Sequence, residues 1–515
     1  MIRCNRAALL SCAASAAILF AGCAGHGGGS PALPLVRSNN EGVQSVRAMQ
    51  PGIARLAHQP PVSMQMAFLM TDGSVLAQSN GGNTWYKYVP DAFGGYSDGT
   101  WSQVASLPSN YAPTAFASAV LADGRLVISG GEYNVGGSYP LQLTNLGAIY
   151  DPKANTWMPI GHPAGWQFIG DSPSSVLPDG RFFVGQKLTK HGAVFSGATM
   201  SWSTVATTGK SDFNAEEGFT LLPDGTVLTA DVKHAPNSEI YSPSNGTWKT
   251  AGSTIVDLHS PTTISGCVRY GSAPSDCYYP PGEIGPLMLR PDGTVFATGS
   301  ASGPNENGPG HTAIYHTSGS LAGTWTTGPN FPNNDNAGDS FAVLLPSGNV
   351  LVFGVSGELY EFDGSTFAAK GGASGSPLLL PTGQVLMVGS TVALYTPSGQ
   401  AHAAWAPHVT SAPSSVTRGS SYTISGTQFN GLSQAMSFGD EFQNATNYPL
   451  VRITNTKSGH VFYARTHDHS SMGVATGTKV VTTHFDVPAG TEAGVSTLEV
   501  VANGIASTAV SVTVK

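Results

Sequence analysis

One short unit recurs seven times along this chain: an apolar strand, a two-residue turn ending in glycine, and a second apolar strand. Its clearest copy reads SSVLPDGRFFVG. The seven turn glycines are Gly73, Gly124, Gly180, Gly225, Gly293, Gly348 and Gly383. Asp-Gly or Ser-Gly between apolar runs is typical of a β-hairpin, because glycine adopts the positive φ that a tight hairpin turn requires. A chain built on seven such hairpins is expected to be an all-β protein.

The hairpins are followed by a second pair of strands with an aromatic pattern. It is seen in IYDPKANTW from Ile149, IYSPSNGTW from Ile240, IYHTSGSLAGTW from Ile314 and, more weakly, LYEFDGSTF from Leu359. Four strands per repeat make one blade, and the turn glycines recur near the period of about 50 residues expected of kelch repeats. The pattern therefore predicts a seven-bladed, kelch-type β-propeller over residues 60–405. We expect Trp85, Trp157, Trp202, Trp248 and Trp325 to pack mostly between blades.

The composition agrees with an all-β fold and narrows the function. Only 10% of the residues are charged, while 64 are Gly and 35 are Pro, which favours short strands and tight turns over helices. The net charge of −8 argues against nucleic-acid binding, because no basic stripe is present to neutralise phosphates. From residue 406 to 515 the blade pattern is replaced by short alternating strands, which predict an immunoglobulin-like β-sandwich.

Residues 1–23 have the features of a lipoprotein signal peptide. Arg3 and Arg6 form a basic start, an apolar run follows, and Ala21-Gly22-Cys23 ends it with small residues. The last five residues of this segment resemble a bacterial lipobox, in which Cys23 is lipidated. We therefore expect an exported lipoprotein, anchored to a membrane of the cell envelope (outer membrane, periplasmic side or cell surface), with simple secretion as the alternative. Residues 24–59 show no strong pattern and are expected to be a linker.

Two of the five cysteines are expected to form a disulfide bond. Cys4 and Cys12 lie in the signal segment and Cys23 is the expected lipid site, which leaves Cys267 and Cys277. An exported chain meets an oxidising environment, so a disulfide between these two neighbours is the natural interpretation. A metal-binding dithiol is the minor alternative.

A kelch propeller followed by an immunoglobulin-like domain resembles the galactose oxidase and glyoxal oxidase family of copper radical oxidases, from about Leu56 to Lys515. The resemblance implies copper ligands and a cross-linked Tyr–Cys cofactor at the starts of innermost strands, nine or ten residues before the turn glycine. At the matching positions this chain has Ala373 and Ser374 in place of the family's Tyr-His pair, and Asp171 in place of the cross-linked tyrosine. We therefore do not expect copper or alcohol oxidation of that type.

In the resembled family a final copper ligand is a His on a loop of the C-terminal domain. Here FYARTHDHSSMG is similar to that loop, with His467 the closest match and His469 the second. If this loop enters the propeller channel as it does in the family, both histidines are candidate metal ligands.

Carboxylates stand where the family has copper ligands. Asp171, Glu216 and Asp339 lie nine residues before their turn glycines, Glu283 lies ten before, and Glu217 adjoins Glu216. These positions predict an acidic mouth of the central channel. Crowded carboxylates need protons, solvent or a bound cation. Oxygen ligands suit Ca²⁺, and a mixed site with histidine suits Zn²⁺, Mn²⁺ or Fe²⁺. The alternative is that the carboxylates cap strand-start amides and sit apart in solvent.

Our leading functional hypothesis is a cell-envelope binding or scaffold module whose ligand, a carbohydrate or a cationic group, meets the acidic mouth. Trp166, which precedes Asp171, is a candidate for stacking on a sugar. The rival hypothesis is an enzyme, either an oxidoreductase with a diverged cofactor or a metal-assisted hydrolase or lyase. It would use Asp171, Glu216, Glu283, Asp339 and His467.

Overall fold

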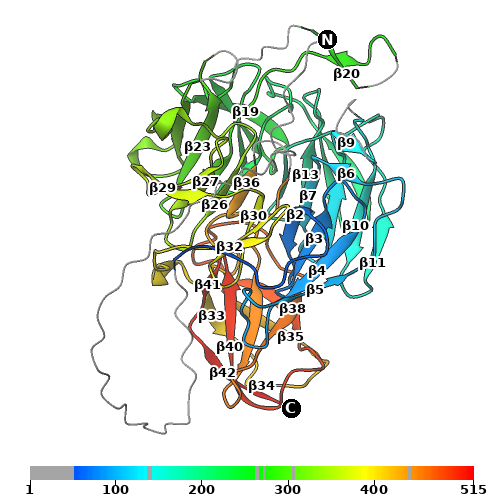
Figure 1. Ribbon diagram of the computed structural model, residues 1–515, viewed down its shortest axis with the longest axis vertical. Helices are drawn as coiled ribbons and strands as arrows, with labels where there is room; N and C mark the ends of the chain where they lie inside the picture. Colours follow the sequence, from blue (N-terminus) through cyan, green and yellow to red (C-terminus); the bar gives the residue numbers. More distant parts are fainter. Residues whose placement is uncertain (1–50, 136–141, 261–265, 271–272, 304–307, 439–441) are drawn as a thin grey trace, which may run out of the picture. The chain divides into compact units, whose positions relative to one another are not determined.

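The computed structural model describes residues 51–515 except 136–141, 261–265, 271–272, 304–307 and 439–441. The part of the chain so described is almost entirely β-structure (Figure 1). Its helical elements are the three-residue 3₁₀ turns η3 (Gly319–Leu321), η4 (Pro332–Asn334) and η5 (Ala403–Trp405). Within these residues no helix is long and apolar enough to cross a membrane. The expected signal peptide and Cys23 lie outside the described residues.

Seven antiparallel blades of four strands each confirm the predicted propeller; six are separate sheets, and the sheet of blade 6 takes β36 (Met436–Phe438) as a fifth strand. The first four blades are β2 (Met64–Leu69), β3 (Val75–Ser79), β4 (Trp85–Val89), β5 (Thr100–Gln103); β7 (Ala117–Val120), β8 (Leu126–Ser129), β10 (Gly147–Asp151), β11 (Thr156–Pro159); β12 (Ser174–Val176), β13 (Phe182–Gly185), β14 (Gly192–Ser196), β15 (Ser201–Val205); and β16 (Thr220–Leu221), β17 (Val227–Ala230), β18 (Asn237–Ser242), β19 (Thr247–Ser253). The other three are β22 (Leu287–Leu289), β23 (Thr294–Ala301), β24 (Gly310–His316), β25 (Trp325–Thr327); β26 (Phe341–Leu344), β27 (Val350–Phe353), β28 (Glu358–Phe362), β29 (Phe367–Gly372); and β30 (Ser376–Leu379), β31 (Val385–Val388), β32 (Ala393–Thr396) with β1 (Gly52–Arg55).

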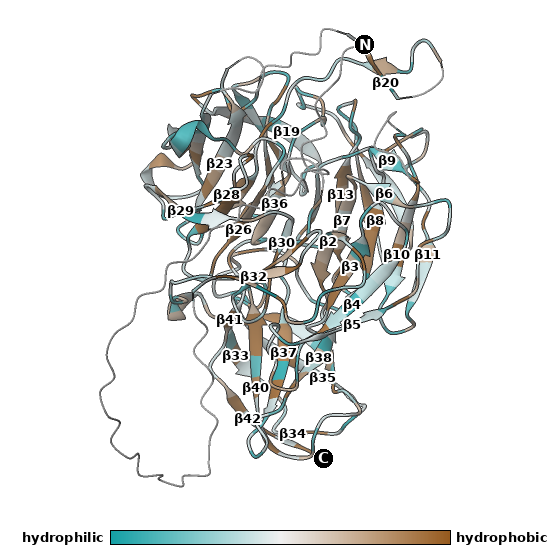
Figure 2. Cartoon of the chain, viewed as in Figure 1, coloured by the Kyte–Doolittle hydropathy of each residue, from teal (hydrophilic) through white to brown (hydrophobic). Residues whose placement is uncertain are grey.

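The hairpin turns and the aromatic residues act as the sequence predicts. The seven turn glycines have φ between 74° and 86°. Trp85 of blade 1 packs against Trp157 of blade 2 with ring centroids 4.8 Å apart, and Trp248 of blade 4 packs against Phe183 of blade 3 at 6.3 Å. Burial falls from the inner to the outer strands, and Figure 2 shows β8 and β13 in brown and the outer strand β11 in paler, more hydrophilic colours.

An N-terminal strand closes the ring. β1 pairs antiparallel with β32, from Gly52 opposite Thr396 to Arg55 opposite Ala393, and so supplies the outermost strand of blade 7. The next residue, Leu56, is 3% exposed and its N–H donates to the carbonyl of Val392 at 3.1 Å. Residues 52–56 lie in the segment expected to be a linker, and they belong to the propeller instead.

The C-terminal domain is a curled sheet folded over its own core, which agrees with the predicted sandwich. Its strands are β33 (His408–Ser411), β34 (Ser415–Val416), β35 (Ser421–Thr427), β37 (Leu450–Asn455), β38 (Val461–His467), β39 (Val481–Asp486), β40 (Gly494–Ala502), β41 (Ile505–Ala506) and β42 (Val510–Val514). The first half of β38 pairs with β37 and its last three residues pair with β39, so the sheet bends at this strand. Val416, Ile453 and Phe485 are among the buried residues inside the bend.

Two stretches of the C-terminal domain, residues 434–438 and 442–448, lie against the first strands of the blades in the propeller channel, and together we call them the plug. Its strand β36 (Met436–Phe438) pairs with β26, the first strand of blade 6, with Phe438 opposite Phe341 (Figure 1). Gln434 accepts from the N–H of Leu221 and donates to Ser175, which joins blades 4 and 3. Asn444 donates to the carbonyls of Ala67 and Pro377, the backbone N–H of Gln443 donates to Ser118 Oγ, and the Tyr448 hydroxyl donates to Leu69. The plug thus bonds to the first strands of six blades.

Candidate functional site

The two ends of the first strands face different surroundings. The ends with the hairpin turns, here called the turn face, carry the C-terminal domain: the N–H groups of Thr466, His469 and Met472 donate to the carbonyls of Thr71, Ala122 and Pro178, which belong to the turns of blades 1 to 3. The opposite ends, here called the strand-start face, carry the candidate carboxylates. The histidine loop and the carboxylates therefore lie at opposite ends of the first strands, too far apart to form one site.

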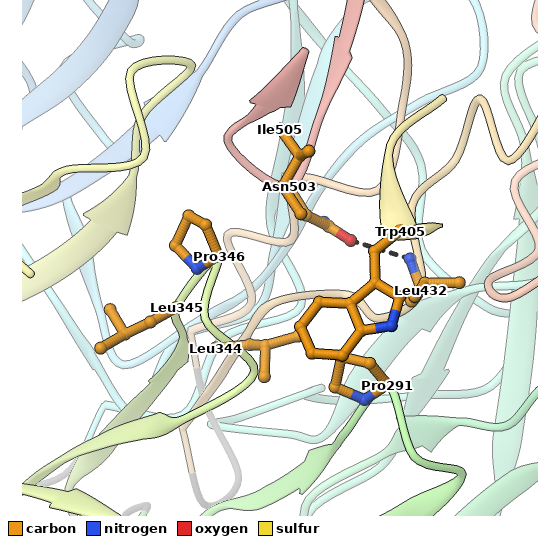
Figure 3. Close-up of a pocket in the computed structure, with 8 residues that line it drawn as sticks. All are labelled: Pro291, Leu344, Leu345, Pro346, Trp405, Leu432, Asn503 and Ile505. Carbon is orange, nitrogen blue, oxygen red and sulfur yellow. Dashed lines mark hydrogen bonds between the residues drawn. The ribbon is translucent and has the colours of Figure 1, made fainter. Parts of the chain in front are cut away.

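The turn face is closely packed. A cavity there, whose lining residues are drawn in Figure 3, has a volume of only about 10 Å³, room for about one water molecule. Pro291, Leu344, Leu345, Pro346, Trp405, Leu432, Asn503 and Ile505 line it. Asn503 Oδ1 accepts from the N–H of Leu432 at 3.0 Å inside this joint. These residues join the propeller to the C-terminal domain, and the cavity is too small for a ligand.

The two candidate histidines lie in the C-terminal domain at the turn face, and the plug occupies the channel that we considered for them. His467 Nδ1 lies 2.7 Å from Asp468 Oδ2 and its Nε2 lies 3.1 Å from Asp486 Oδ1, with His484 stacked at 5.5 Å. His469 is buried and its Nδ1 bonds to Thr483 at 2.8 Å. Burial lowers the pKa of His469 to about 3, so this imidazole is neutral. We considered a metal site shared by these histidines and the carboxylates if the loop entered the channel. The loop stays at the turn face, so the histidines and the carboxylates do not form that site.

A first buried cluster, the Lys187 cluster, holds two of the predicted carboxylates. Lys187 follows β13, and its completely buried ammonium donates to Asp171 and lies 3.0 Å from Glu216 Oε1 and 3.9 Å from Glu132 Oε1. Burial and the charge of Glu132 raise the pKa of Asp171 to about 8, against the opposing effect of Lys187. Three carboxylates thus share one ammonium, and the cluster holds a proton at neutral pH. Asp171 and Glu216 are neutralised inside the protein and do not form an open acidic mouth.

A second buried cluster, the Lys210 cluster, contains Glu217, the residue that follows Glu216. Lys210 Nζ lies 2.8 Å from Glu217 Oε2 and 2.7 Å from Glu239 Oε2, and Thr229 also donates to Glu217. Burial alone would lower the pKa of Lys210, but Glu217 and Glu239 raise it above its usual range. Burial raises the pKa of Glu217 well above its usual range, against the opposing effect of Lys210. The lysines were not singled out by sequence because they lie at no fixed spacing from their partners.

Glu283 and Asp339 occupy the strand-start face of blades 5 and 6 and are half-buried. A backbone hydrogen bond connects the two blades beside these residues: the N–H of Asp339 donates to the carbonyl of Ile284, the residue after Glu283, at 3.1 Å. Glu216 and Asp339 have φ of 60° and 51°, a conformation that costs most residues free energy. This left-handed kink precedes the first strand in both blades and fixes the direction in which each carboxylate leaves the backbone.

Trp166 is not the stacking surface that we expected. Its side chain is 5% exposed and packs in the large propeller core, and its carbonyl accepts from Asn145 at 2.9 Å. The nearby Phe168 is half-buried instead, with its ring edge-on to Tyr270 at 5.2 Å. Burial of the apolar indole ring in the core stabilises the fold at this position, so the ring is not available to stack on a ligand.

An aromatic cavity of about 320 Å³ lies beside the two clusters, on the strand-start side. Leu188, Phe213, Ala215, Lys233, Tyr270, Cys277, Tyr278, Tyr279 and Pro281 line it. Tyr278 connects it to the Lys187 cluster, because the ammonium of Lys187 lies 5.8 Å from the centre of the Tyr278 ring. We call this the aromatic cavity. Its volume falls at the lower end of the range for small-molecule sites.

One wall of the aromatic cavity is a small hairpin held by the predicted disulfide bond. The hairpin consists of β20 (Val268–Arg269) and β21 (Cys277–Tyr278), and a disulfide joins Cys267 to Cys277. It lies in the long insertion before blade 5. The sequence predicted the disulfide but not the cavity, because the lining residues come from four separate segments of the chain.

The strand-start positions do not fit a copper radical centre. Nine residues before each turn glycine stand Met64, Ala115, Asp171, Glu216, Ile284, Asp339 and Ser374. None of these supplies an imidazole, a phenol or a thiol, which are the donors that such a copper site uses. The donor chemistry therefore disagrees with the oxidation chemistry of the resembled family.

No family model matches the chain. A stretch of 54 residues, 10% of this chain, is 41% identical to an F-box/kelch-repeat protein of Arabidopsis thaliana and covers 15% of that protein's length. The likeness to a kelch-repeat protein is confined to this stretch.

Solved structures with a similar fold include a fungal alcohol oxidase of the AA5 family, determined in complex with copper. Its TM-score is 0.48 at 14% identity, with 90% of this chain and 98% of that chain covered. Another is a streptogramin B lyase, with a TM-score of 0.43 at 10% identity over 66% of this chain and 96% of that chain. At these identities the likenesses concern the fold and say nothing of activity.

Proposed function

We propose that this protein is a binding module of the cell envelope whose ligand is a carbohydrate held in the aromatic cavity. The observation that carries the proposal is the lining: Phe213, Tyr270, Tyr278 and Tyr279 converge on one space of about 320 Å³. The C–H faces of a sugar ring pack well on aromatic rings, and the tyrosine hydroxyls can bond to its hydroxyl groups. Tyr279, which is 71% exposed, leaves the cavity open to solvent.

The charges favour a neutral or acidic sugar over the cationic ligand that we also considered. Lys233 is the one charged side chain among the described residues that line the cavity, and its ammonium lies 4.2 Å from the centre of the Phe213 ring. The carboxylates of the Lys187 cluster, Asp171 and Glu216, are occupied by Lys187. A carboxylated sugar would gain an ion pair with Lys233, whereas a cation would be repelled by it.

Lipidation of Cys23 would tether this module to a membrane of the envelope, and the proposal includes that anchor. Residues 24–50 would then serve as the tether between the lipid and β1. Gly and Ser between residues 25 and 30 favour a flexible chain there.

The experiment is a glycan-array screen of the purified mature protein, followed by calorimetric titration of the sugars that bind. We expect Tyr270→Ala and Tyr278→Ala each to weaken binding at least tenfold. Phe93→Ala is the matched control, because Phe93 is an aromatic residue that is 58% exposed and lies outside the cavity. Absence of binding across the array, or equal binding by the tyrosine variants, would refute the proposal. Peroxide release from primary alcohols would instead favour the oxidoreductase alternative.

A further inference from the structure

Asp231, directly after β17, carries a buried carboxylate without a partner. The residue is 2% exposed, and neither carboxylate oxygen has a hydrogen-bond partner in the described part of the chain. An ionised carboxylate removed from water with no donor beside it is strongly unfavourable. The position therefore requires a proton or a cation.

The ammonium of Lys210, which lies in the same region, already pairs with two other carboxylates. Lys210 bonds to Glu217 and Glu239, as described above, and one donor atom of each of these glutamates lies within 4.8 Å of an oxygen of Asp231. Asp212, which is 1% exposed, donates its N–H to Glu239 Oε2 at 3.3 Å, so four buried carboxylates share this region with one lysine. Asp231 is the one of these four whose two oxygens both lack a hydrogen-bond partner among the described residues.

Asp212 and His234 lie on the other side of Asp231. One donor atom each of Asp212, Asp231 and His234 lie within 4.8 Å of one another. The backbone N–H groups of Lys233 and His234 donate to Asp212 Oδ2 at 2.8 and 3.2 Å, which fixes this carboxylate. His234 Nδ1 lies 3.3 Å from Asp212 Oδ1, and its side chain is 45% exposed.

We propose that Asp212, Asp231 and His234 bind one divalent transition-metal ion of the Zn²⁺ or Mn²⁺ class. Two carboxylates and one imidazole are a donor set that suits these ions. Ligands on opposite sides of an ion bound at about 2.0–2.4 Å are about 4–4.8 Å apart, so the three donors are near enough to share it. The exposed side of His234 gives the ion access from solvent. The ion would offset two of the three negative charges that Lys210 leaves uncompensated.

The rival explanation is a proton shared by Asp231 and Glu239. Burial, and after it the charge of Glu239, raises the pKa of Asp231 to about 8, which is consistent with either a proton or a cation at this place. The two explanations differ in one respect: a proton needs no His234, whereas the metal site does.

The test is metal binding to the full mature protein after treatment with a chelator. Zn²⁺, Mn²⁺ and Ca²⁺ are each titrated calorimetrically, and bound metal is counted by elemental analysis after gel filtration. We expect one Zn²⁺ or Mn²⁺ per chain. Asp231→Asn, an isosteric change that removes the uncompensated charge and keeps the fold, should weaken binding at least tenfold, and so should His234→Gln at its partly exposed position.

Asp224→Asn and His191→Gln are the matched controls, because both residues are exposed and lie outside the proposed ligand set. Both should bind the ion as the wild type does. Failure of the wild type to retain Zn²⁺ or Mn²⁺, or unchanged binding by the Asp231 and His234 variants, would overturn the proposal and leave the shared proton. A preference for Ca²⁺ would also overturn it, because that ion selects oxygen ligands.

Discussion

Lys210 Nζ lies 2.8 Å from Glu217 Oε2, and both side chains are completely buried. The preceding residue, Glu216, pairs with a different lysine, Lys187, at 3.0 Å. Two consecutive glutamates at the start of blade 4 are thus held by two lysines, one that follows β13 within blade 3 and one that follows the last strand of that blade. The pairs tie neighbouring blades together at the strand-start face.

Replacing Lys210 by Met should destabilise the protein by about 3–5 kcal/mol, because it leaves Glu217 and Glu239 buried without a cation. The measurement is urea denaturation at neutral pH. Adding Glu217→Gln to the variant should restore part of the loss, since it removes one buried charge. Lys249→Met, an exposed change on β19, is the control and should alter stability by less than about 0.5 kcal/mol. A loss below about 1 kcal/mol for Lys210→Met would contradict this account.

The Lys187 cluster should make stability fall as the pH rises from 4 to 8. The folded protein raises the pKa of Asp171 from 3.8 to about 8, so the folded state binds this proton more tightly than the unfolded state does. The resulting stability is fully present below pH 4, declines by up to about 1.4 kcal/mol per pH unit, and is lost above pH 8.

Asp171→Asn removes that proton equilibrium, so its unfolding free energy should fall less between pH 5 and 8 than that of the wild type. Urea denaturation at several pH values measures the difference. Asp179→Asn, at an exposed turn of the same blade, should keep the slope of the wild type. Parallel curves for the wild type and Asp171→Asn would show that the cluster holds no titrating proton in this range.

Reduction of the disulfide bond should loosen the wall of the aromatic cavity and leave the propeller folded. The bond closes a short loop and is worth somewhat under about 3 kcal/mol, and the hairpin it holds is only two residues wide on each side. We expect trypsin to cut after Arg269 much faster in the presence of reductant, with the main unfolding transition in place. The double variant Cys267→Ser, Cys277→Ser should behave like the reduced protein without reductant. Equal cleavage rates would mean that packing alone holds the hairpin.

Asn444 should be important for stability despite its distance from any proposed site. Its amide donates to Ala67 of blade 1 and Pro377 of blade 7 at 2.9 and 2.8 Å, across the seam where the ring closes. Asn444→Ala leaves two buried carbonyls unsatisfied and should cost about 2–4 kcal/mol. Calorimetric unfolding measures the loss, with the exposed Asn110→Ala as control. A variant as stable as the wild type would show that the plug is held by its apolar contacts alone.

The features predicted from sequence are those encoded locally. Each hairpin contains its own turn glycine, so all seven could be read without knowing what they pack against. The strand β36 has only three residues, and β1 has the unremarkable sequence GIAR, so neither shows a periodic pattern. Both are strands because of partners far along the chain, β26 and β32.

Only part of the candidate site could be predicted, because only some of its residues are placed by local sequence. Counting from the turn glycines placed Asp171 and Glu216 at the strand-start face, where the structure has them. It could not show that Lys187 reaches both, since that contact depends on how blades 3 and 4 face each other. Lys233 and Tyr270 likewise come together only after the insertion before blade 5 has folded back.

Because β1 pairs with β32, the ring can close only after both strands have been synthesised. A ribosome releases Gly52 long before Thr396, so the first strand of the ring has no partner until the seventh blade has been synthesised, and Asn444, which spans the seam, emerges later still. Domains commonly fold as they emerge, beginning at the N-terminus. This ring cannot close in that way, because β1 meets β32 only after the seventh blade has been made, so the step that completes the circle is also among the last to become possible.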